Sequence, residues 1–292
     1  PVALVPPGKC VVIGAGLAGA SVAAALARRG WQVQVLDQAD APSEGASGLP
    51  VGLVVPHVSR DDCVLSRLSR AGVRMMLQQA QTHLRLAQDW APSGVLERQI
   101  DGEPQLPAQW PTAAETWSRG MPDAGSVSTN CSVGPGLWHP HGAWIKPAEL
   151  VKAWLEQHGS TLRSGAKVAA LRHQGGEWKV LDAANACIAS GDQVVLANAS
   201  GAFKLLSELQ QTSHTIDGLR PNLLKIQEMR GLLTWSGDSD VEPSTKYQSF
   251  PAFPVNGSAS LIPAIPVARG TAWFMGSSYQ DATEPERSDA DN

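Results

Sequence analysis

The chain has 292 residues, of which 43% are hydrophobic and 17% charged, and it contains 28 Gly and 21 Pro. This composition excludes a disordered polymer and a coiled coil, and a prior of roughly 150 residues per domain predicts about two folded domains. The formal net charge of −4 excludes a global positive field, so contact with a nucleic acid would need a local basic patch. The apolar runs fall far short of the ~20 residues of a spanning helix, so no membrane association is expected.

Cysteine usage and the chain ends give two further expectations. The four cysteines lie far apart and form no paired motif, which favours a reducing cytoplasm over a disulfide framework or a zinc site. The sequence begins with a Pro-rich stretch without Met or a signal peptide, and residues 281–292 have the polar pattern that opens a helix. We therefore expect a segment of a longer cytoplasmic polypeptide.

The first elements form a predicted βαβ unit. Residues 9–13 are a short run rich in β-branched residues, which is typical of a buried parallel strand. The glycine-rich stretch 14–19 leads into residues 17–29, where Ala and Leu recur at helical spacing, and residues 31–36 indicate a second strand. Asp37 follows that strand, 18 residues after the third glycine of the loop. This order is the full context of a dinucleotide-binding fingerprint.

Each residue type in this unit suits that chemistry. Gly14 permits a tight turn, Gly16 lets the backbone approach a pyrophosphate, and Gly19 lets helix and strand pack closely. The amides at the start of the helix would meet the phosphate charge. Asp37 would accept hydrogen bonds from ribose hydroxyls and repel a 2′-phosphate, which favours FAD or NAD over NADP. The alternative is a glycine turn in an ordinary βαβ unit without a ligand.

A Gly- and Ser-rich loop follows Asp37 where an NAD-binding domain would more often begin its next helix, and its amides and hydroxyls could meet a pyrophosphate or a flavin. Together with this loop, motifs spread over most of the chain point to one family: residues 12–20, residues 45–48 with Gly52 and Pro56, and residues 142–150, 194–199 and 275–279. They resemble the glutathione-reductase-like flavoproteins of the D-amino-acid oxidase superfamily. Within it, the chain is most similar to the FAD-dependent C-terminal part of the bifunctional tRNA 5-methylaminomethyl-2-thiouridine biosynthesis proteins.

The resemblance implies an α/β fold, with a glutathione-reductase-like FAD-binding Rossmann domain and an interleaved α+β substrate domain. The FAD-binding domain would take residues 1–75, 141–211 and an incomplete C-terminal part at 263–292. The substrate domain would take residues 76–140 and 212–262.

Site residues follow from the motifs and the resemblance. FAD would be the cofactor, and Arg230, which stands where related oxidases enter a strand over the flavin, would hold a substrate carboxylate by its guanidinium group. Lys225, Lys246 and Arg269 are fallbacks for that cation. The catalytic candidates are Arg230 and Tyr279, and the substrate candidates are Ser277, Ser278 and Lys225. The cofactor-binding candidates are Gly14, Ala15, Gly16, Leu17, Ala18, Gly19, Asp37, Gly45, Ala46, Ser47, Gly48, Gly52, Val168, Ala197 and Gly201.

Residues 60–88 predict an amphipathic helix with five arginines. They form either a solvated basic face or a local patch that contacts tRNA phosphates. Further on, residues 147–158 predict a helix and residues 166–190 a β-meander. His139 and His141 flank a proline, but no Cys, Asp or Glu joins them, so no metal is expected.

The resemblance implies an FAD-dependent oxidoreductase that acts on a carbon–nitrogen bond in tRNA modification. The reaction would remove the carboxymethyl group from carboxymethylaminomethyl-uridine at the wobble position and give aminomethyl-uridine and glyoxylate. An upstream S-adenosylmethionine-dependent methyltransferase domain would make the whole protein a multifunctional enzyme. Two alternatives stay open: a small-molecule amine or amino-acid oxidase of the glycine or sarcosine oxidase kind, and a non-catalytic, truncated dinucleotide-binding fold.

Overall fold

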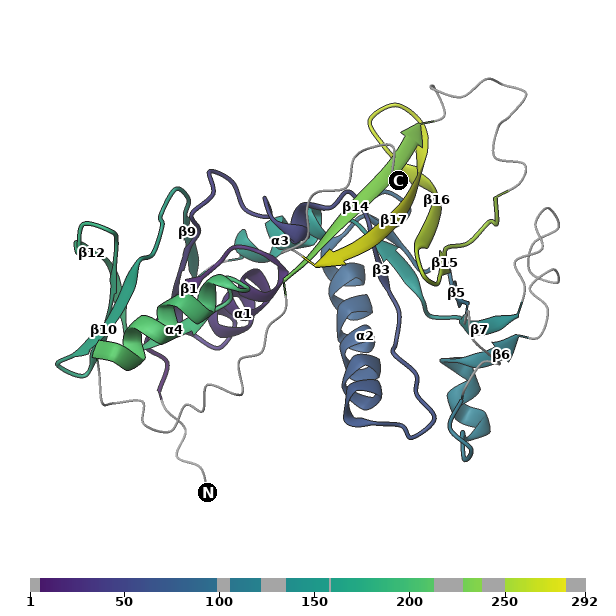
Figure 1. The fold of residues 1–292 in the computed structure, drawn as a ribbon, viewed down its shortest axis with the longest axis horizontal. Helices are drawn as coiled ribbons and strands as arrows, with labels where there is room; N and C mark the ends of the chain where they lie inside the picture. Colours follow the sequence, from purple (N-terminus) through teal and green to yellow (C-terminus); the bar gives the residue numbers. More distant parts are fainter. Residues whose placement is uncertain are drawn as a thin grey trace. The chain divides into compact units, whose positions relative to one another are not determined.

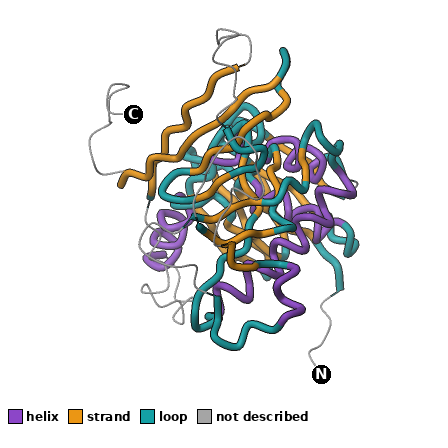
Figure 2. The backbone as a smooth tube through the Cα atoms, turned by 90° about the vertical axis from the view of Figure 1, so that its right-hand side faces the viewer, coloured by secondary structure: helices purple, strands orange, loops and turns teal. Residues whose placement is uncertain are grey.

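The computed structural model describes residues 6–98, 106–121, 135–157, 159–212, 228–237 and 250–281, which are coloured by element type in Figure 2. The chain divides into two compact units, and each unit is built from two stretches of sequence. The first unit takes Pro1–Pro50 and Pro147–Glu228, and the second takes Val51–Lys146 and Met229–Asn292. Compactness alone does not say which unit holds which ligand, so the five domain segments expected from the sequence stay a prediction.

The first unit is built on a four-stranded parallel sheet in the order β13-β1-β2-β9, accompanied by a three-stranded antiparallel sheet in the order β10-β11-β12. Its elements are β1 (Lys9–Ile13), α1 (Leu17–Ala27), β2 (Gln32–Leu36), the short 3-10 helix η1 (Ala46–Gly48), α3 (Pro147–Leu155), β9 (Ser160–Arg163), β10 (Ala170–Gln174), β11 (Glu177–Leu181), β12 (Cys187–Gly191), β13 (Gln193–Leu196) and α4 (Gly201–Thr212).

Alternate residues of β1 build two cores in this unit. Cys10 and Val12 pack on one face of the parallel sheet with residues of α1 and α3. Val11 and Ile13 pack on the other face with residues of β10, β11, β12 and α4. Because both faces of β1 are covered, its sequence is continuously apolar rather than alternating, as expected for a buried parallel strand.

The second unit contains a seven-stranded sheet in the order β14-β17-β16-β15-β5-β7-β6 and a three-stranded sheet in the order β3-β8-β4. Strands β14 and β17 run side by side as a long antiparallel pair (Figure 1). Its elements are β3 (Gly52–Val54), α2 (Val64–His83), β4 (Trp90–Ala91), β5 (Val95–Glu97), the 3-10 helix η2 (Thr112–Thr116), β6 (Arg119–Met121), β7 (Gly136–His139), β8 (Ala143–Ile145), β14 (Met229–Gly237), β15 (Val255–Asn256), β16 (Ser260–Pro266) and β17 (Thr271–Asp281).

Among the described residues of the second unit, two clusters form a hydrophobic core. One gathers Trp144 with Phe274 and other residues of β16 and β17, and the other gathers Leu96 with Phe253 and their neighbours. Among the described residues, no helix combines the length and the apolar character that crossing a membrane requires.

The predicted helix at 60–88 is shorter in the structure, where α2 spans Val64–His83. It ends because Leu84 adopts an extended backbone with φ −115° and ψ 152°, and a turn closed by Arg85 and Asp89 follows. The helical spacing of apolar residues in the sequence therefore extends beyond the residues that form the helix, which is why the prediction was too long. The strand β9 and the helix α4 were not assigned from the sequence, and the pattern at residues 282–292 lies outside the described residues.

Candidate functional site

The glycine-rich loop connects β1 to α1 in the first unit, and Gly14 makes its sharp turn. The backbone of Gly14 has a φ of +107°, and its amide donates a hydrogen bond of 2.8 Å to the Leu36 carbonyl at the end of β2. A Cβ atom at Gly14 would lie 2.5 Å from the carbonyl oxygen of Ala197. The position therefore needs glycine both for its conformation and for the close approach of the chain after β13.

The other two glycines of the loop hold α1 close to its surroundings. A Cβ atom at Gly19 would overlap the carbonyl oxygen of Gly14, so only glycine lets the first turn of α1 settle onto the loop. A Cβ atom at Gly16 would lie 2.9 Å from Oγ of Ser47. The start of α1 therefore lies against the loop that contains η1, and its amides are concentrated at one place where an anion can bind.

The acid that follows β2 is joined to the glycine loop. Oδ2 of Asp37 accepts a hydrogen bond of 2.6 Å from the amide of Ala15, and Oδ1 accepts one of 2.9 Å from the amide of Ala39. Asp37 is half-buried. Since a carboxylate oxygen can accept about two hydrogen bonds, both oxygens keep capacity for a ribose hydroxyl.

The Gly- and Ser-rich loop provides a second side of the site. Oγ of Ser47 accepts a hydrogen bond of 3.0 Å from the amide of Leu17, which is the first residue of α1. A Cβ atom at Gly48 would overlap the carbonyl oxygen of Ser43, so the loop closes tightly on itself. Gly45 and Ala46 lie in the same turn, where the Gly48 amide donates to the Gly45 carbonyl over 2.8 Å.

The remaining cofactor-binding candidates of this unit come from two more segments. The Ala197 amide donates a hydrogen bond of 2.8 Å to the Ile13 carbonyl, and Gly201 begins α4 four residues later. The Ala166 amide donates one of 2.7 Å to the Asp37 carbonyl, so the segment that reaches the half-buried Val168 starts beside the acid. The first unit thus gathers all predicted cofactor-binding residues except Gly52, which pairs with Ile145 in the second unit.

Two residues of this region were missed as site residues by the sequence analysis. Oγ of Ser43 and Oδ1 of Asn198 are both buried, and neither has a hydrogen-bond partner within the described chain. Unpaired buried polar atoms are rare, and they point to a polar ligand. The only indication of their role in the sequence was their position. Ser43 lies in the loop that follows Asp37, and Asn198 lies just after the end of β13. Together with the glycine cradle, they fit a dinucleotide.

Of the predicted catalytic and substrate residues, Arg230 lies on β14 and Ser277, Ser278 and Tyr279 lie on β17 of the second unit. Arg230 pairs with Gln280 and Gly231 with Tyr279 in the backbone register. Arg230 is half-buried and makes a further interaction within the protein. Ser277 is half-buried. The side chains of Ser278 and Tyr279, and the whole of Lys225 and Lys246, lie outside the described part of the chain, whereas Arg269 is exposed.

The arginines of the predicted basic helix have different partners. Arg70 makes a two-pronged ion pair with Asp62 at 2.7 and 3.1 Å, and the side chain of Arg85 makes one with Asp89 at 2.8 and 2.9 Å. The guanidinium carbon of Arg74 lies 4.7 Å from the ring centroid of Trp117. Arg67 is exposed. Two of these arginines are therefore neutralised by carboxylates, which reduces the net charge of the patch.

The two histidines beside Pro140 lie in different environments. His139 is fully buried, with Nδ1 at 2.9 Å from Oγ of Ser118 and Nε2 at 3.0 Å from a carboxylate oxygen of Glu97. His141 is exposed and contacts the Trp117 ring. Among the residues that the structure describes, no three His, Cys, Asp or Glu side chains gather as a metal site would require.

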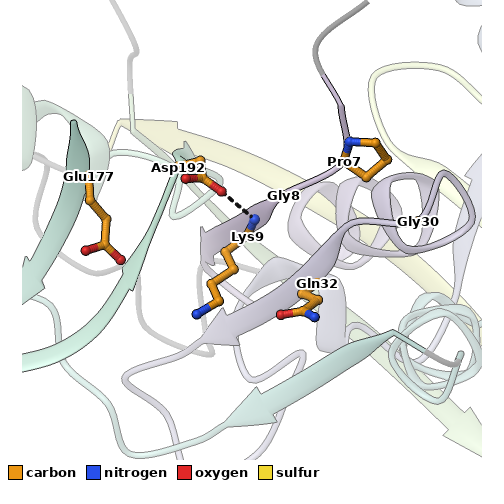
Figure 3. Close-up of a pocket in the computed structure, with 7 residues that line it drawn as sticks. All are labelled: Pro7, Gly8, Lys9, Gly30, Gln32, Glu177 and Asp192. Atoms are coloured by element: carbon orange, nitrogen blue, oxygen red, sulfur yellow. Dashed lines mark hydrogen bonds between the residues drawn. The ribbon is translucent and has the colours of Figure 1, made fainter.

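The first unit also has a pocket at the opposite edge of its parallel sheet. This pocket of about 390 Å³ is lined by Lys9, Gln32, Glu177 and Asp192 with neighbouring backbone (Figure 3). The Asp192 carboxylate accepts a hydrogen bond of 2.7 Å from the Lys9 amide, drawn as a dashed line in Figure 3. Lys9 and Gln32 begin β1 and β2, whereas ligands of open α/β sheets bind at the carboxyl ends of the strands. The glycine loop, at the carboxyl ends, is therefore the better candidate for a dinucleotide site.

Comparison with known proteins identifies relatives over nearly the whole chain. A protein from Albidiferax ferrireducens is 50% identical over 289 residues, which cover 97% of this chain and 42% of the relative. One from Polaromonas naphthalenivorans is 47% identical over 290 residues, which cover 96% of this chain and 44% of the relative. Both are described as tRNA 5-methylaminomethyl-2-thiouridine biosynthesis bifunctional proteins. The chain spans less than half the length of these relatives.

Among solved structures, glycine oxidase from Geobacillus kaustophilus is similar with a TM-score of 0.67 at 14% identity, over 98% of this chain and 75% of that one. At this identity the similarity concerns the fold. The model of the family described as FAD dependent oxidoreductase matches residues 9–291, which include the glycine loop and its acid. The chain therefore belongs to the FAD-dependent oxidoreductase family, and FAD is its cofactor.

Proposed function

We propose that this chain carries out the FAD-dependent oxidative removal of the carboxymethyl group from carboxymethylaminomethyl-uridine at the tRNA wobble position. The products are aminomethyl-uridine and glyoxylate. The observation that carries the proposal is the 50% identity, over 97% of the chain, to a relative named for the biosynthesis of 5-methylaminomethyl-2-thiouridine in tRNA. A complete glycine loop with its acid is the support from this chain's own residues.

The first unit would bind the cofactor. Amides of residues 14–19 at the start of α1 would meet the pyrophosphate, and Asp37 would accept hydrogen bonds from a ribose. The backbone at Val168 would lie along the adenine. The unpaired oxygens of Ser43 and Asn198 would gain partners on the ligand.

The second unit would bind the substrate arm, which is chemically an N-substituted glycine. Its carboxylate needs a cation, and Arg230 is the candidate because a guanidinium group binds a carboxylate through two parallel hydrogen bonds. Tyr279 would line the reacting centre as the second catalytic candidate. Ser277, Ser278 and Lys225 would add polar contacts to the uridine or its arm.

The reaction balances as an oxidation followed by a hydrolysis. FAD, when bound, supplies the acceptor for a hydride from the methylene carbon of the arm. The nitrogen loses its proton, the carbon–nitrogen bond becomes an imine, and water adds to the imine carbon. Cleavage then leaves an amine on the uridine and the aldehyde of glyoxylate, while molecular oxygen takes up the two electrons and becomes hydrogen peroxide.

The test uses the purified chain reconstituted with FAD. A flavin absorption spectrum after gel filtration, and glyoxylate formed in equal amount to aminomethyl-uridine in tRNA that carries the modification, are the expected results. Arg230→Lys should raise the KM for the modified tRNA while the flavin spectrum stays unchanged, because lysine keeps the charge and loses the two-pronged geometry. Flavin binding without turnover of modified tRNA contradicts the proposal.

The same purified chain and FAD also test two alternative functions. The similarity of the fold to glycine oxidase favours a small-molecule amine oxidase as the second candidate. Peroxide release with glycine or sarcosine, but not with modified tRNA, would identify that activity. A chain that takes up no FAD would instead support a non-catalytic fold.

The wider setting of the chain is also part of the proposal. Because the relatives are bifunctional and more than twice as long, we place this oxidoreductase beside a further domain, an S-adenosylmethionine-dependent methyltransferase that would methylate the product amine. The tRNA would be met through a local basic patch, since the whole chain has a net charge of −4. With a tRNA substrate, the protein would act in the cytoplasm.

A further inference from the structure

Three side chains of the second unit form a continuous row, which we call the Arg74–Trp117–His141 row. The guanidinium carbon of Arg74 lies 4.7 Å from the centroid of the Trp117 ring. The ring of His141 lies 4.5 Å from that of Trp117, measured between centroids, with the two planes tilted by 39°. Trp117 is half-buried, whereas Arg74 and His141 at the two ends are exposed. The row therefore offers solvent two flat, polarisable groups.

The segment that carries Trp117 is fixed by polar contacts within the unit. Oγ of Ser118 lies 2.9 Å from Nδ1 of His139, whose Nε2 lies 3.0 Å from the Glu97 carboxylate. Ser118 and His139 are both fully buried. The indole nitrogen of Trp110 donates a hydrogen bond of 2.9 Å to the Ser118 carbonyl. The row is thus preorganised, which lowers the entropy cost of binding a flat ligand to it.

The surroundings of the row are basic although the chain as a whole is acidic. Helix α2 has three arginines and no Asp or Glu over its twenty residues. Arg70 is paired with Asp62, but Arg67 and Arg74 are exposed on the helix, and Arg119 is exposed on β6. Exposed guanidinium groups of this kind can contact the phosphates of an RNA backbone independently of its base sequence.

We infer that the Arg74–Trp117–His141 row is a base-stacking surface for a single-stranded loop of RNA, with Arg67 and Arg119 as phosphate contacts. The inference rests on the proposed function, whose substrate base lies in the tRNA anticodon loop. Unpaired RNA bases stack on aromatic rings and on guanidinium planes, and an α-helix and a strand edge with arginines can follow the backbone. If the row served only to hold residues 106–121 against α2, neither Arg74 nor His141 would need to be exposed to solvent.

The experiment compares two fluorescent probes, an anticodon stem–loop and the same stem–loop with abasic loop nucleotides. The second probe keeps the phosphates and lacks the bases. The wild-type chain is expected to bind the intact loop about tenfold more tightly than the abasic loop, the order of one stacking contact. Trp117→Ala should bind both probes equally, at the abasic affinity, with an unchanged dependence on salt. Arg67→Gln should weaken both probes alike and lower the salt dependence, because it removes a phosphate contact.

A matched control exists in the first unit. Trp178 contacts His173 with ring centroids 5.0 Å apart and planes tilted by 53°, so Trp178→Ala removes a similar aromatic pair away from the row. Trp178→Ala should keep the preference for the intact loop. Trp117→Phe, which retains an aromatic face, should keep most of it, and His141→Ala provides a second reading if Trp117→Ala does not fold.

The outcomes separate this surface from the proposed function. If Trp117→Ala, Trp117→Phe and His141→Ala all bind the intact loop as the wild-type chain does, the row is not a base-stacking surface. The proposed tRNA substrate is not affected by that result. Equal losses in Trp117→Ala and Trp178→Ala overturn it as well. A wild-type chain that binds neither probe and turns over no modified tRNA contradicts the proposed function, and the surface with it.

Discussion

The carboxylate of Asp37 accepts a hydrogen bond of 2.6 Å from the backbone amide of Ala15. Asp37 follows β2 and Ala15 follows β1, so this one bond joins the carboxyl ends of two neighbouring parallel strands. The acid expected to hold a ribose therefore also fixes the loop expected to meet the phosphates. Changes at Asp37 should affect both contacts at once.

The substitution Asp37→Asn keeps the size of the side chain and removes its charge. One amide–carboxylate hydrogen bond is worth about 1.5–3 kcal/mol, so we expect the Kd for FAD to rise about 10- to 150-fold. Quenching of flavin fluorescence during titration of the apoprotein measures this constant. An unchanged Kd would remove Asp37 from the site.

The control for Asp37→Asn is Asp192→Asn. The Asp192 carboxylate also accepts a hydrogen bond from a backbone amide, that of Lys9 over 2.7 Å, but at the amino ends of the strands (Figure 3). The Kd for FAD should stay within about twofold of the wild-type value, because ligands of such sheets bind at the other edge.

A second prediction concerns two glycines of the same site. Gly14→Ala forces a φ of +107° on alanine and places its Cβ atom 2.5 Å from the Ala197 carbonyl oxygen. A left-handed alanine alone costs about 1–2 kcal/mol, which lowers Tm by roughly 2–8 °C, and the displaced loop should lose FAD. Differential scanning fluorimetry and flavin absorbance measure the two effects.

Gly45→Ala is the matched variant for that prediction. Gly45 has a φ of −89°, and no described atom lies within 4 Å of the Cβ atom that the substitution adds. The variant should keep the wild-type Tm in the absence of FAD. A large fall in the Tm of Gly45→Ala, or none in Gly14→Ala, would contradict the geometry of the loop.

Local patterns predicted the dinucleotide unit almost residue for residue. The strand at residues 9–13 was predicted with its observed bounds, and the second strand differs by one residue, because β-branched apolar runs and Ala-rich helical spacing are signals that neighbouring residues carry. In the sequence the two strands flank a helix that is buried on its Ala-rich face, and in the structure they pair with each other, so local preference and packing agree. Such agreement is what makes a segment readable from sequence.

Contacts between residues that are distant in the sequence could not be predicted from local patterns. The unpaired oxygens of Ser43 and Asn198 became visible only when the chain after β13 came back to Gly14, which no local spacing encodes. The contact of Arg74 with Trp117 joins residues 43 positions apart, so the arginines of α2 looked like a plain charged face. Neutralisation of Arg70 by Asp62 was hidden for a related reason, since the pairing depends on how the loop before α2 folds back.

A third prediction tests the contact between the second loop and α1. Oγ of Ser47 accepts a hydrogen bond of 3.0 Å from the Leu17 amide, so it acts as a cap for the start of that helix although it is 30 residues away. Ser47→Ala should lower the free energy of unfolding by about 1 kcal/mol, the usual cost of a lost helix cap. Urea denaturation followed by circular dichroism measures it.

Ser21→Ala is the comparison for Ser47→Ala, because Ser21 lies on the same helix and its hydroxyl donates to the Ala18 carbonyl at an exposed position. Its unfolding free energy should stay within about 0.5 kcal/mol of the wild-type value. If both variants lose the same stability, the Ser47 contact is no more than a surface hydrogen bond.

The last prediction concerns acid stability of the second unit. Hydrogen bonds from the Arg85 side chain, 2.8 and 2.9 Å long, hold the pKa of the Asp89 carboxyl below its ordinary value, and Asp89 is only 4% exposed. A lowered pKa in the folded state contributes stability that is complete above the unfolded value, about pH 4, and is lost as the pH falls through the folded pKa. The free energy of unfolding of the wild-type chain should therefore exceed that of Asp89→Asn at pH 7, and the difference should shrink below about pH 4. Urea titrations between these pH values measure the difference. The control is Asp40→Asn at an exposed position, whose free energy of unfolding should differ from that of the wild-type chain by nearly zero. A difference between wild type and Asp89→Asn that is the same at every pH would mean that the asparagine variant loses packing rather than an ionised partner of Arg85.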